Sequence, residues 1–387
     1  MSGTIFMFAT GIGRSDGGIA AANRNVLAAM ERIAKRMGAA LEVHILHEPA
    51  GTIHRTSESG GRIVEKSHGG NRYTMGIAIA RSLLRSRLVL FDHVHLAAPL
   101  AALSVMPWLI RAKTVICAHG SESWKRVKLI SMMAFQTADL TLANSNYTLK
   151  NMRGTFDGFT GQACPLGLPP QFILTPSPPP RSAKRPVLRA ADGTERAISD
   201  RTMLLVGRMD PAEQEKGHRE LISLLPRVCR EVADADLVFV GGGGDAQALA
   251  EIAAASPSAG RIFLPGRVDD HQLSELYAAA YAYVMPSRQE GFGLVYLEAM
   301  HHALPCLACH EDGAADVVVD GQTGLLVKQP IDDDELTAAM VDLLSNPLRA
   351  RKLGEAGWRR LNNQFTAEAH RSRVERALVS LLDDNRS

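Results

Sequence analysis

Residues 286–299 read PSRQEGFGLVYLEA and decide how the second half of the chain folds. An apolar run leads to Glu290, glycines at 291 and 293 allow a tight turn, and a helix that carries Glu298 follows. The start of such a helix suits an anionic or polyhydroxylated ligand, because about half a positive charge resides there. The two glutamates could accept hydrogen bonds from separate parts of one hydroxyl-rich ligand. The spacing is equally compatible with a strand–turn–helix unit that carries two incidental surface glutamates.

Apolar runs and amphipathic segments alternate on both sides of this stretch, as expected for buried strands and covering helices. In the first half we expect strands at residues 5–9, 41–46, 88–91, 114–117 and 140–143, and helices at 19–37, 75–87, 96–109 and 123–137. In the second half we expect strands at 202–206, 237–240, 261–264, 280–285 and 307–308, and helices from His218, Asp245, His271, Gly293 and Asp332. This βαβ pattern predicts an α/β protein with two Rossmann-like domains, each with a doubly wound parallel sheet. Residues 348–382 are expected to be helical only.

A proline-rich stretch separates the two series. Residues 176–181 read PSPPPR, and the polar residues after them show no apolar period, so we expect a linker or surface loop at 176–200. We predict an N-terminal domain at 1–175, a C-terminal domain at 201–365, and a C-terminal helix at 366–387 that packs back on the N-terminal domain. Ligands of such domains bind at the carboxyl ends of the strands, so the cleft between the domains is the expected site.

Composition and charge exclude several classes of protein. The 387 residues are 46 % hydrophobic and 22 % charged, which excludes collagen, coiled coil and gross disorder. The net charge of +2 hides an asymmetry, because residues 1–175 hold 19 Lys and Arg against 10 Asp and Glu. That half has a net charge of +9, and the remainder has −7. Five scattered cysteines form no disulfide framework, so we expect reduced thiols in a cytoplasmic protein.

We expect neither a signal peptide nor a membrane span. Residues 1–8 lack a basic region and lead directly into glycines, and no apolar run approaches the roughly 20 residues that cross a bilayer. The basic segment WKRVKLI at 124–130, with Arg81, Arg85 and Arg87, nonetheless suits an anionic membrane surface, where each cation contributes about 1 kcal/mol. An ordinary solvated helix face is the alternative. No aromatic-rich basic stripe points to nucleic acid.

Several blocks of the second half resemble those of the family-4 retaining glycosyltransferases, which have the GT-B fold. The spacing of Glu290 and Glu298 within EGFGLVYLE looks like the signature of that family. Further similar blocks follow in the expected order: VGRM at 206–209 with EKGH at 215–218, VGGGG at 240–244, LPGRV at 264–268 and GQTGLLV at 321–327. Weaker matches in the first half are DGGI at 16–19, CAHGSE at 117–122 and ANS at 143–145.

The resemblance implies an enzyme that transfers a hexose from a UDP- or GDP-sugar to a glycan or lipid-linked glycan, in bacterial polysaccharide or glycolipid biosynthesis. Arg208 and Lys216 would neutralise the donor diphosphate, Glu290 would contact the donor sugar, and His119 would lie beside the reacting sugar. Cleavage of the sugar–phosphate bond leaves charge on the diphosphate, which two cations and a helix start can stabilise without a metal. One such donor, Arg208, would supply about 3 kcal/mol of transition-state stabilisation. No cofactor beyond the nucleotide sugar is therefore expected.

Further donor contacts are implied by the same resemblance. They involve Gly17 and Gly18 at the diphosphate, Gly291, Phe292, Gly293 and Leu294 at the sugar or distal phosphate, Glu298 at the ribose, and Arg267 and Val268 near the base. The family's chemistry is usually drawn as a displacement on one face of the sugar in which the leaving phosphate helps to deprotonate the acceptor, so no protein nucleophile is nominated.

Three departures leave the sugar, the base and the acceptor open. Asp312 stands where the family commonly has a glutamate, LGLP at 166–169 replaces the usual Asn-Gly-Val-Asp, and the acidic residues 213–215 precede Lys216.

Two other functions stay open. Glycines at 11, 13, 17 and 18, with Glu48 beyond the second strand, superficially resemble the dinucleotide loop of an NAD(P)-dependent oxidoreductase, although the third glycine is misplaced. A non-catalytic sugar-nucleotide-binding protein is the second alternative.

Three pairs that resemble metal or redox motifs are expected to be structural. They are Cys306 with Cys309 across a buried strand, Asp234 with Asp236 in a loop before a strand, and His93 with His95 alternating on one strand without an obvious third ligand.

Overall fold

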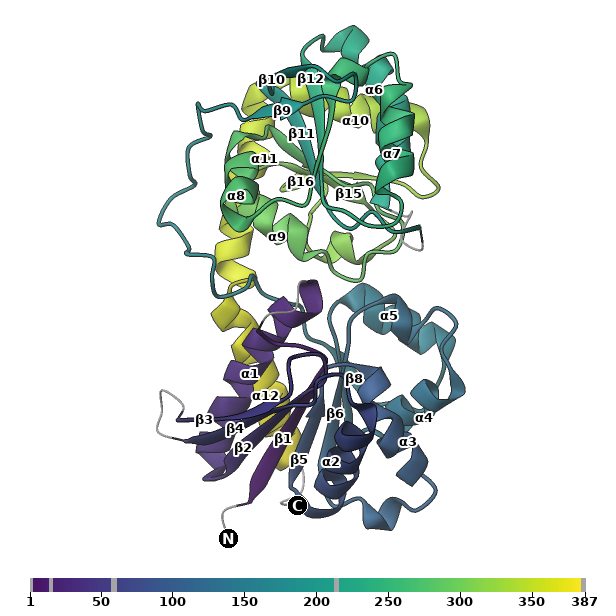
Figure 1. Cartoon of the computed structure of the whole chain (residues 1–387), viewed down its shortest axis with the longest axis vertical. Helices are drawn as coiled ribbons and strands as arrows, with labels where there is room; N and C mark the ends of the chain where they lie inside the picture. The colour runs from purple at the N-terminus through teal and green to yellow at the C-terminus, as the bar shows by residue number, and fades with distance from the viewer. Residues whose placement is uncertain (1–2, 14–16, 57–60, 212–215, 384–387) are drawn as a thin grey trace. The chain divides into compact units, whose positions relative to one another are not determined.

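The computed structural model describes residues 3–13, 17–56, 61–211 and 216–383, which form two compact units (Figure 1). Unit 1 comprises Met1–Phe172 and Phe365–Ser387, and unit 2 comprises Ile173–Gln364.

Unit 1 is built on an eight-stranded sheet of order β3-β4-β2-β1-β5-β6-β7-β8, in which only the β3–β4 pair is antiparallel. The strands are β1 (Thr4–Ala9), β2 (Ala40–Ile45), β3 (Gly51–Thr56), β4 (Arg62–Ser67), β5 (Leu88–Phe91), β6 (Lys113–Ala118), β7 (Leu140–Ala143) and β8 (Gly161–Ala163). The helices are α1 (Gly18–Met37), α2 (Arg72–Arg85), α3 (Ala98–Leu103), α4 (Leu129–Thr137), α5 (Asn146–Thr155) and α12 (Ala367–Asp383), with short turns η1 (Val94–Ala97), η2 (Pro107–Leu109) and η3 (Ser121–Ser123).

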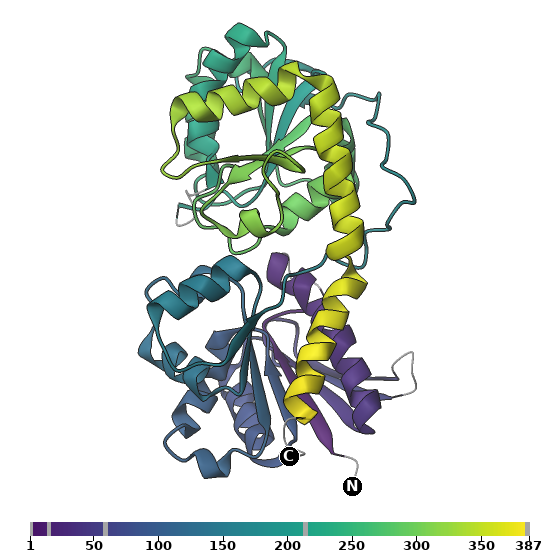
Figure 2. The same cartoon turned by 180° about the vertical axis from the view of Figure 1, so that it is seen from behind.

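Alternation along the strands of unit 1 produces a core on each face of the sheet. Along β1, Ile5 and Met7 point into the core beneath α1 and α12, whereas Phe8 points into the core beneath α2, α3 and α4. The last helix, α12, lies alongside α1 (Figure 2), and Arg32 joins Glu368 through two hydrogen bonds of 2.7 Å.

Unit 2 contains a six-stranded, fully parallel sheet of order β13-β12-β11-β14-β15-β16 and a separate hairpin. The strands are β9 (Val187–Arg189), β10 (Glu195–Ala197), β11 (Arg201–Val206), β12 (Ala235–Val240), β13 (Ile262–Gly266), β14 (Ala282–Val284), β15 (Cys306–Cys309) and β16 (Gly324–Val327). The helices are α6 (His218–Glu231), α7 (Ala246–Ala254), α8 (Asp270–Ala279), α9 (Leu294–His301), α10 (Asp333–Ser345) and α11 (Pro347–Gln364), with turns η5 (Ala259–Arg261) and η6 (Gly313–Asp316).

Two expected helices of unit 1 differ from the prediction. The helix expected at 123–137 begins only at Leu129, because Arg126 has a φ of 51° and Lys128 is an extended N-cap. The helix expected at 96–109 is broken into η1, α3 and η2, since Pro107 has no N–H to continue a helix from α3. The basic segment 124–130 is therefore largely a loop.

Part of the stretch expected as a linker or loop forms the hairpin β9–β10. Its strands have only three residues each, and Asp192 and Gly193 make the turn between them, where Gly193 has a φ of 90°. The Asp192 carboxylate accepts a hydrogen bond from the Thr194 N–H at 2.9 Å. An Asp-Gly pair is a recognised hairpin signal, which the search for apolar periodicity missed.

The hairpin is fixed to the sheet by a buried carboxylate. Asp236, fully buried on β12, accepts hydrogen bonds from both Nη atoms of Arg196 at 2.6 and 3.1 Å, and from the Ser199 N–H at 2.7 Å. Arg261 contributes a further contact of 3.3 Å. The Asp234/Asp236 pair therefore includes a strand residue, contrary to the expected loop, and Asp236 is structural.

We predict that Asp236→Ala lowers the free energy of unfolding by about 3 kcal/mol, because it leaves the partly buried Arg196 without its counter-charge. The exposed neighbour Asp234 provides a matched control, and Asp234→Ala should change stability by less than about 0.5 kcal/mol. Urea unfolding followed by circular dichroism measures both. Equal midpoints for the two variants would contradict the assignment.

Candidate functional site

Strand order in unit 2 reverses between β11 and β14, and ligands of doubly wound sheets bind at such a reversal beyond the carboxyl ends of the strands. The loop after β11 carries Arg208 and Lys216, and the loop after β14 carries Glu290. The topology therefore brings together three residues that the sequence predicted for the site.

Backbone lies directly against backbone at this edge. A Cβ on Gly241 would lie 1.9 Å from the Gly207 carbonyl oxygen, and one on Gly243 would lie 2.2 Å from that of Met209. Both glycines also have positive φ values, of 141° and 154°. Only glycine satisfies these positions, which explains the glycine run after β12.

Lys216 and Glu290 form an ion pair across the reversal. The Lys216 Nζ lies 3.2 Å from Glu290 Oε2, and each side chain is about one-fifth exposed. The lysine stem passes over Gly207, where an added Cβ would lie 3.0 Å from Lys216 Cδ. A cation and a carboxylate, both accessible from solvent, are thus held at the strand ends.

The turn of 290–294 is rigid because a neighbouring loop packs against it. The Gly313 N–H donates to the Glu290 carbonyl oxygen at 2.8 Å, and a Cβ on Gly313 would lie 2.2 Å from the Gly291 carbonyl oxygen. Gly293 caps α9 with a φ of 84°. Gly291, Phe292 and Leu294 are buried.

Asp312, the expected departure from the family pattern, fixes the loop that packs on this turn. Its Oδ1 accepts a hydrogen bond from the Ala314 N–H at 2.8 Å, and its Oδ2 pairs with the Ser287 hydroxyl. Burial raises the pKa of Asp312 to about 7, although the Ser287 bond opposes the shift.

Glu298 lies on α9 and is held by a tyrosine. The buried Tyr277 hydroxyl of α8 donates to Glu298 Oε2 at 3.0 Å, and the Tyr277 ring stacks on His302 at a centroid distance of 5.3 Å. Burial raises the pKa of Glu298 to about 7, the Tyr277 hydrogen bond opposes that rise, and Asp270 adds to it.

The remaining predicted residues of unit 2 lie on the same edge. Arg208 and Arg267 are exposed, and Val268 is half-buried. The Arg267 stem passes over the end of β12, where a Cβ on Gly242 would lie 3.4 Å from Arg267 Cγ. The acidic residues 213–215 lie outside the described residues.

Unit 1 has its own reversal of strand order, between β1 and β5. Gly17 and Gly18 lie beyond β1 at the start of α1, and Gly17 has a φ of 133°; Asp16 lies outside the described residues. Glu48 fixes the loop after β1, because its Oε1 accepts hydrogen bonds from the Ile12 and Gly13 N–H groups at 3.0 and 2.7 Å. The residue that resembled a ribose ligand therefore has a structural role in this loop.

His119, at the end of β6, is oriented by Asp92. The His119 Nε2 lies 2.6 Å from the Asp92 carbonyl oxygen, which can only accept, so Nε2 carries the proton and Nδ1 is the acceptor of the neutral ring. Glu122 accepts from the His119 N–H at 2.6 Å, and the Asn144 amide donates to the His119 carbonyl oxygen. The ring is therefore held at Nε2, and the backbone of His119 is held on both sides.

Asp92 itself is buried and joins the ends of β1 and β5. Its Oδ2 accepts from the Thr10 N–H at 2.8 Å, the Thr10 hydroxyl at 2.6 Å and the Asn23 amide at 2.7 Å. Burial raises the pKa of Asp92, and the Thr10 hydrogen bonds oppose the rise.

The pairs that resembled metal or redox motifs do not form such sites in the described residues. His93 and His95 do not share a strand, since His95 lies in η1 and its N–H donates to His93 Nδ1 at 3.2 Å. Cys306 and Cys309 are buried thiols on β15, and burial raises the pKa of Cys309 to about 12. In the described parts of the chain, no three His, Cys, Asp or Glu side chains are placed to hold a metal ion.

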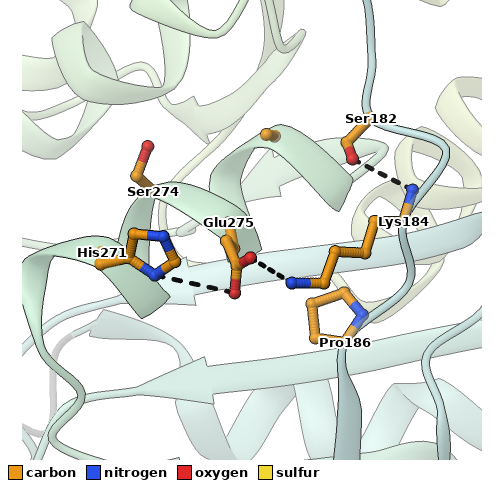
Figure 3. Close-up of a pocket in the computed structure, with 7 residues that line it drawn as sticks. Ser182, Lys184, Pro186, His271, Ser274 and Glu275 are labelled. Carbon is orange, nitrogen blue, oxygen red and sulfur yellow. Dashed lines mark hydrogen bonds and ion pairs between the residues drawn. The ribbon is translucent and has the colours of Figure 1, made fainter.

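Two pockets of unit 2 contain none of the predicted site residues. The smaller, of about 170 Å³, lies beside α8 and is lined by Ser182, Lys184, Pro186, His271, Ser274, Glu275 and Ala278 (Figure 3). The larger, of about 430 Å³, includes Arg196 and Arg261, whose guanidinium groups already bind Asp236.

Two positioning residues escaped the sequence analysis. Asp92 directly follows a strand, so its place at a carboxyl end could have marked it. Tyr277 carries no such signal, because only packing of α8 against α9 brings it to Glu298.

Comparison with known proteins identifies the family of the chain. Residues 194–360 match the family described as Glycosyl transferases group 1. A GDP-mannose-dependent alpha-(1-6)-phosphatidylinositol monomannoside mannosyltransferase of Mycolicibacterium smegmatis is 31 % identical over 274 residues, 67 % of this chain and 69 % of that protein. A GDP-mannose-dependent monoacylated alpha-(1-6)-phosphatidylinositol monomannoside mannosyltransferase of Corynebacterium glutamicum is 30 % identical over 297 residues, 73 % and 74 % of the two chains.

Among solved structures, sucrose-phosphate synthase from Thermosynechococcus elongatus superposes with a TM-score of 0.71 at 19 % identity, over 99 % of this chain and 100 % of that one. This likeness, with the mainly parallel sheet of unit 1 and the parallel sheet of unit 2, confirms the predicted GT-B fold class. The chain therefore belongs to the glycosyl transferases group 1 family of retaining enzymes and is a nucleotide-sugar-dependent glycosyltransferase.

Proposed function

We propose that this enzyme transfers mannose from GDP-mannose to a lipid-anchored glycan. The names of both mycobacterial and corynebacterial relatives specify GDP-mannose and a phosphatidylinositol mannoside. The observation that carries the site assignment is the Lys216–Glu290 pair at the reversal of strand order, above backbone that only glycine permits.

The roles proposed for the residues are those that the family resemblance implies, and charge and hydrogen-bonding capacity support them. In transfer, the bond between the sugar and the diphosphate breaks, the acceptor oxygen bonds to the sugar, and the acceptor proton leaves with the nucleoside diphosphate. Lys216 and Arg208 would stabilise the charge that develops on the diphosphate, Glu290 would accept from sugar hydroxyls, and Glu298 from the ribose. His119 would position the reacting sugar, with Gly17, Gly18 and Gly291–Leu294 as backbone contacts and Arg267 and Val268 near the base.

The same proposal makes the enzyme a peripheral protein of the cytoplasmic membrane face. The acceptors in the names of the relatives are lipids. No helix in the described part of the chain is sufficiently long and apolar to cross a bilayer. The excess of basic residues in the first half suits attachment to anionic lipid instead.

We expect wild-type protein to bind GDP-mannose in calorimetry, and Lys216→Ala and Glu298→Ala each to weaken binding about 10- to 100-fold, since each removes a charged hydrogen-bonding partner. Lys184→Ala is the matched control, because it breaks another Lys–Glu ion pair of unit 2, beside the pocket of Figure 3. It should leave the affinity within about twofold. No affinity for GDP-mannose in the wild type would reject the donor, and unchanged affinity in both site variants would reject the site.

Donor affinity should also depend on pH. Ribose hydroxyls donate to the ionised form of Glu298, whose pKa is raised to about 7 by burial, so the donor Kd should fall about tenfold between pH 6 and pH 8. The groups that face Glu298 are Asp270 and Tyr277 of α8 and Tyr283 of β14. GDP-mannose is the right probe, because GDP has a phosphate that itself titrates near about pH 6. In Glu298→Gln the dependence should vanish; the same slope in that variant would exclude Glu298 as its source.

His119→Ala should lower the turnover of mannose transfer about 100-fold and leave donor affinity nearly unchanged, because the ring would act on the reacting sugar rather than on the nucleotide. The exposed His95→Ala is the control and should retain full turnover. Release of GDP with a lipid-linked glycan gives the rate. A protein that binds the donor and releases no GDP with any acceptor would instead be a sugar-nucleotide sensor.

A further inference from the structure

Four large apolar side chains are exposed within five consecutive residues of unit 1. We call residues 105–109 the apolar hook; Trp108 is 74 % exposed, Val105 is 67 % exposed, and Met106 and Leu109 are each more than one-third exposed. Other exposed apolar side chains are scattered singly or in pairs. A concentration of this kind marks an interaction surface rather than an ordinary stretch of protein exterior.

The hook is an ordered structure. Its turns are closed by hydrogen bonds from the Met106 N–H to the Leu103 carbonyl oxygen at 2.9 Å and from the Leu109 N–H to that of Met106 at 3.0 Å. The Ile110 N–H donates to the Pro107 carbonyl oxygen at 3.0 Å. The exposed side chains therefore lie on an ordered backbone.

Basic residues surround the base of the hook. The Arg111 N–H donates to the Leu83 carbonyl oxygen at 2.9 Å, which fixes the hook to the last turn of α2. Arg85, Arg87 and Arg111 are all exposed. The hook thus precedes β6 at the amino edge of the sheet, opposite the edge that carries His119.

Acidic residues are few in this part of the chain. Residues 72–138 contain nine Lys and Arg but only two acids, and the next one, Asp139, pairs with Lys113 at 3.1 Å. Asp92 is fully buried, and Glu122 binds the backbone of His119 and Gly120. This is the charge complement of an anionic surface.

Helix α2 extends the same surface toward the carboxyl edge. Tyr73, Ile77, Arg81 and Arg85 repeat every four residues, so they share one face of the helix, and all four are exposed. Figure 1 shows α2 beside α3, and the backbone bond to Leu83 joins the end of α2 to the hook. A flat partner could contact the hook and this stripe together.

We infer that the apolar hook inserts into the interfacial layer of an anionic lipid bilayer, with the arginines at its base and along α2 lying on the headgroups. Tryptophan with neighbouring apolar side chains favours that layer, and nearby cations add electrostatic attraction. A second copy of this chain would bring the two basic surfaces together, which like charges oppose. The inference rests on the proposed lipid-anchored acceptor, because it states how the enzyme reaches that acceptor's membrane.

Flotation with vesicles tests the hook directly. Wild-type protein should float with phosphatidylglycerol-containing vesicles at low salt and much less with pure phosphatidylcholine. The double variant Met106→Ser/Trp108→Ser, which leaves every charge in place, should lower the partition coefficient about tenfold or more. The control Val187→Ser/Leu348→Ser removes two exposed apolar side chains from unit 2 and should float like the wild type.

Donor binding separates this inference from the proposed function. Both double variants should bind GDP-mannose like the wild type, which also shows that they are folded. Wild-type protein that binds GDP-mannose but does not float would overturn the inference alone, as would a hook variant that floats undiminished. Equal flotation with neutral and anionic vesicles would overturn the inference that the membrane partner is anionic. A wild-type dimer that the hook substitutions convert to a monomer would assign the hook to a second copy and equally overturn it.

Discussion

At the carboxyl ends of β11 and β12 the two backbones lie in direct contact, and the candidate site depends on this close packing. No side chain separates the two strand ends, since a Cβ on Gly241 would lie 1.9 Å from the Gly207 carbonyl oxygen. Lys216 crosses closely over Gly207, where a Cβ would lie 3.0 Å from Lys216 Cδ, and its ammonium group reaches Glu290. The loop after β15 packs equally closely, because a Cβ on Gly313 would lie 2.2 Å from the Gly291 carbonyl oxygen. Chemistry at this edge therefore depends on places where only glycine fits.

Two carboxyl groups of unit 2 have different surroundings. Asp236, near the amino end of β12, is surrounded by two guanidinium groups and a backbone N–H, so its hydrogen-bonding capacity is used within the fold. Glu298, on α9, accepts a hydrogen bond from the Tyr277 hydroxyl at Oε2, and burial raises its pKa to about 7. A carboxylate has about four lone-pair sites, so in the proposed role Glu298 would also accept from hydroxyls of a ligand.

The sequence predicted the parts of the fold that depend on local pattern. The expected strand at 88–91 is β5, and the helix expected from Asp332 is capped by that residue through the Asp334 and Glu335 N–H groups. Prediction was wrong where one residue interrupts a pattern, as Arg126 does in the left-handed region and Pro107 does after α3. It missed contacts that exist only in three dimensions, such as that of Tyr277 with Glu298. For the predicted site residues, the fold settles position, whereas their roles remain proposals.

The uneven charge of the chain explains why a cation at the strand ends, such as Lys216 in its pair with Glu290, matters for binding an anionic ligand. Residues 176–387 have a net charge of −7, which repels a nucleotide diphosphate, so attraction must come from cations placed at the strand ends. Lys216 is held there by Glu290 at 3.2 Å. In the proposed site, a nucleotide sugar would offer a substitute for each partner, because its phosphate would accept from the lysine while its sugar hydroxyls would donate to the glutamate. An anion alone would satisfy Lys216 and leave Glu290 beside a second negative charge, so the pair favours a ligand that carries phosphate and sugar together.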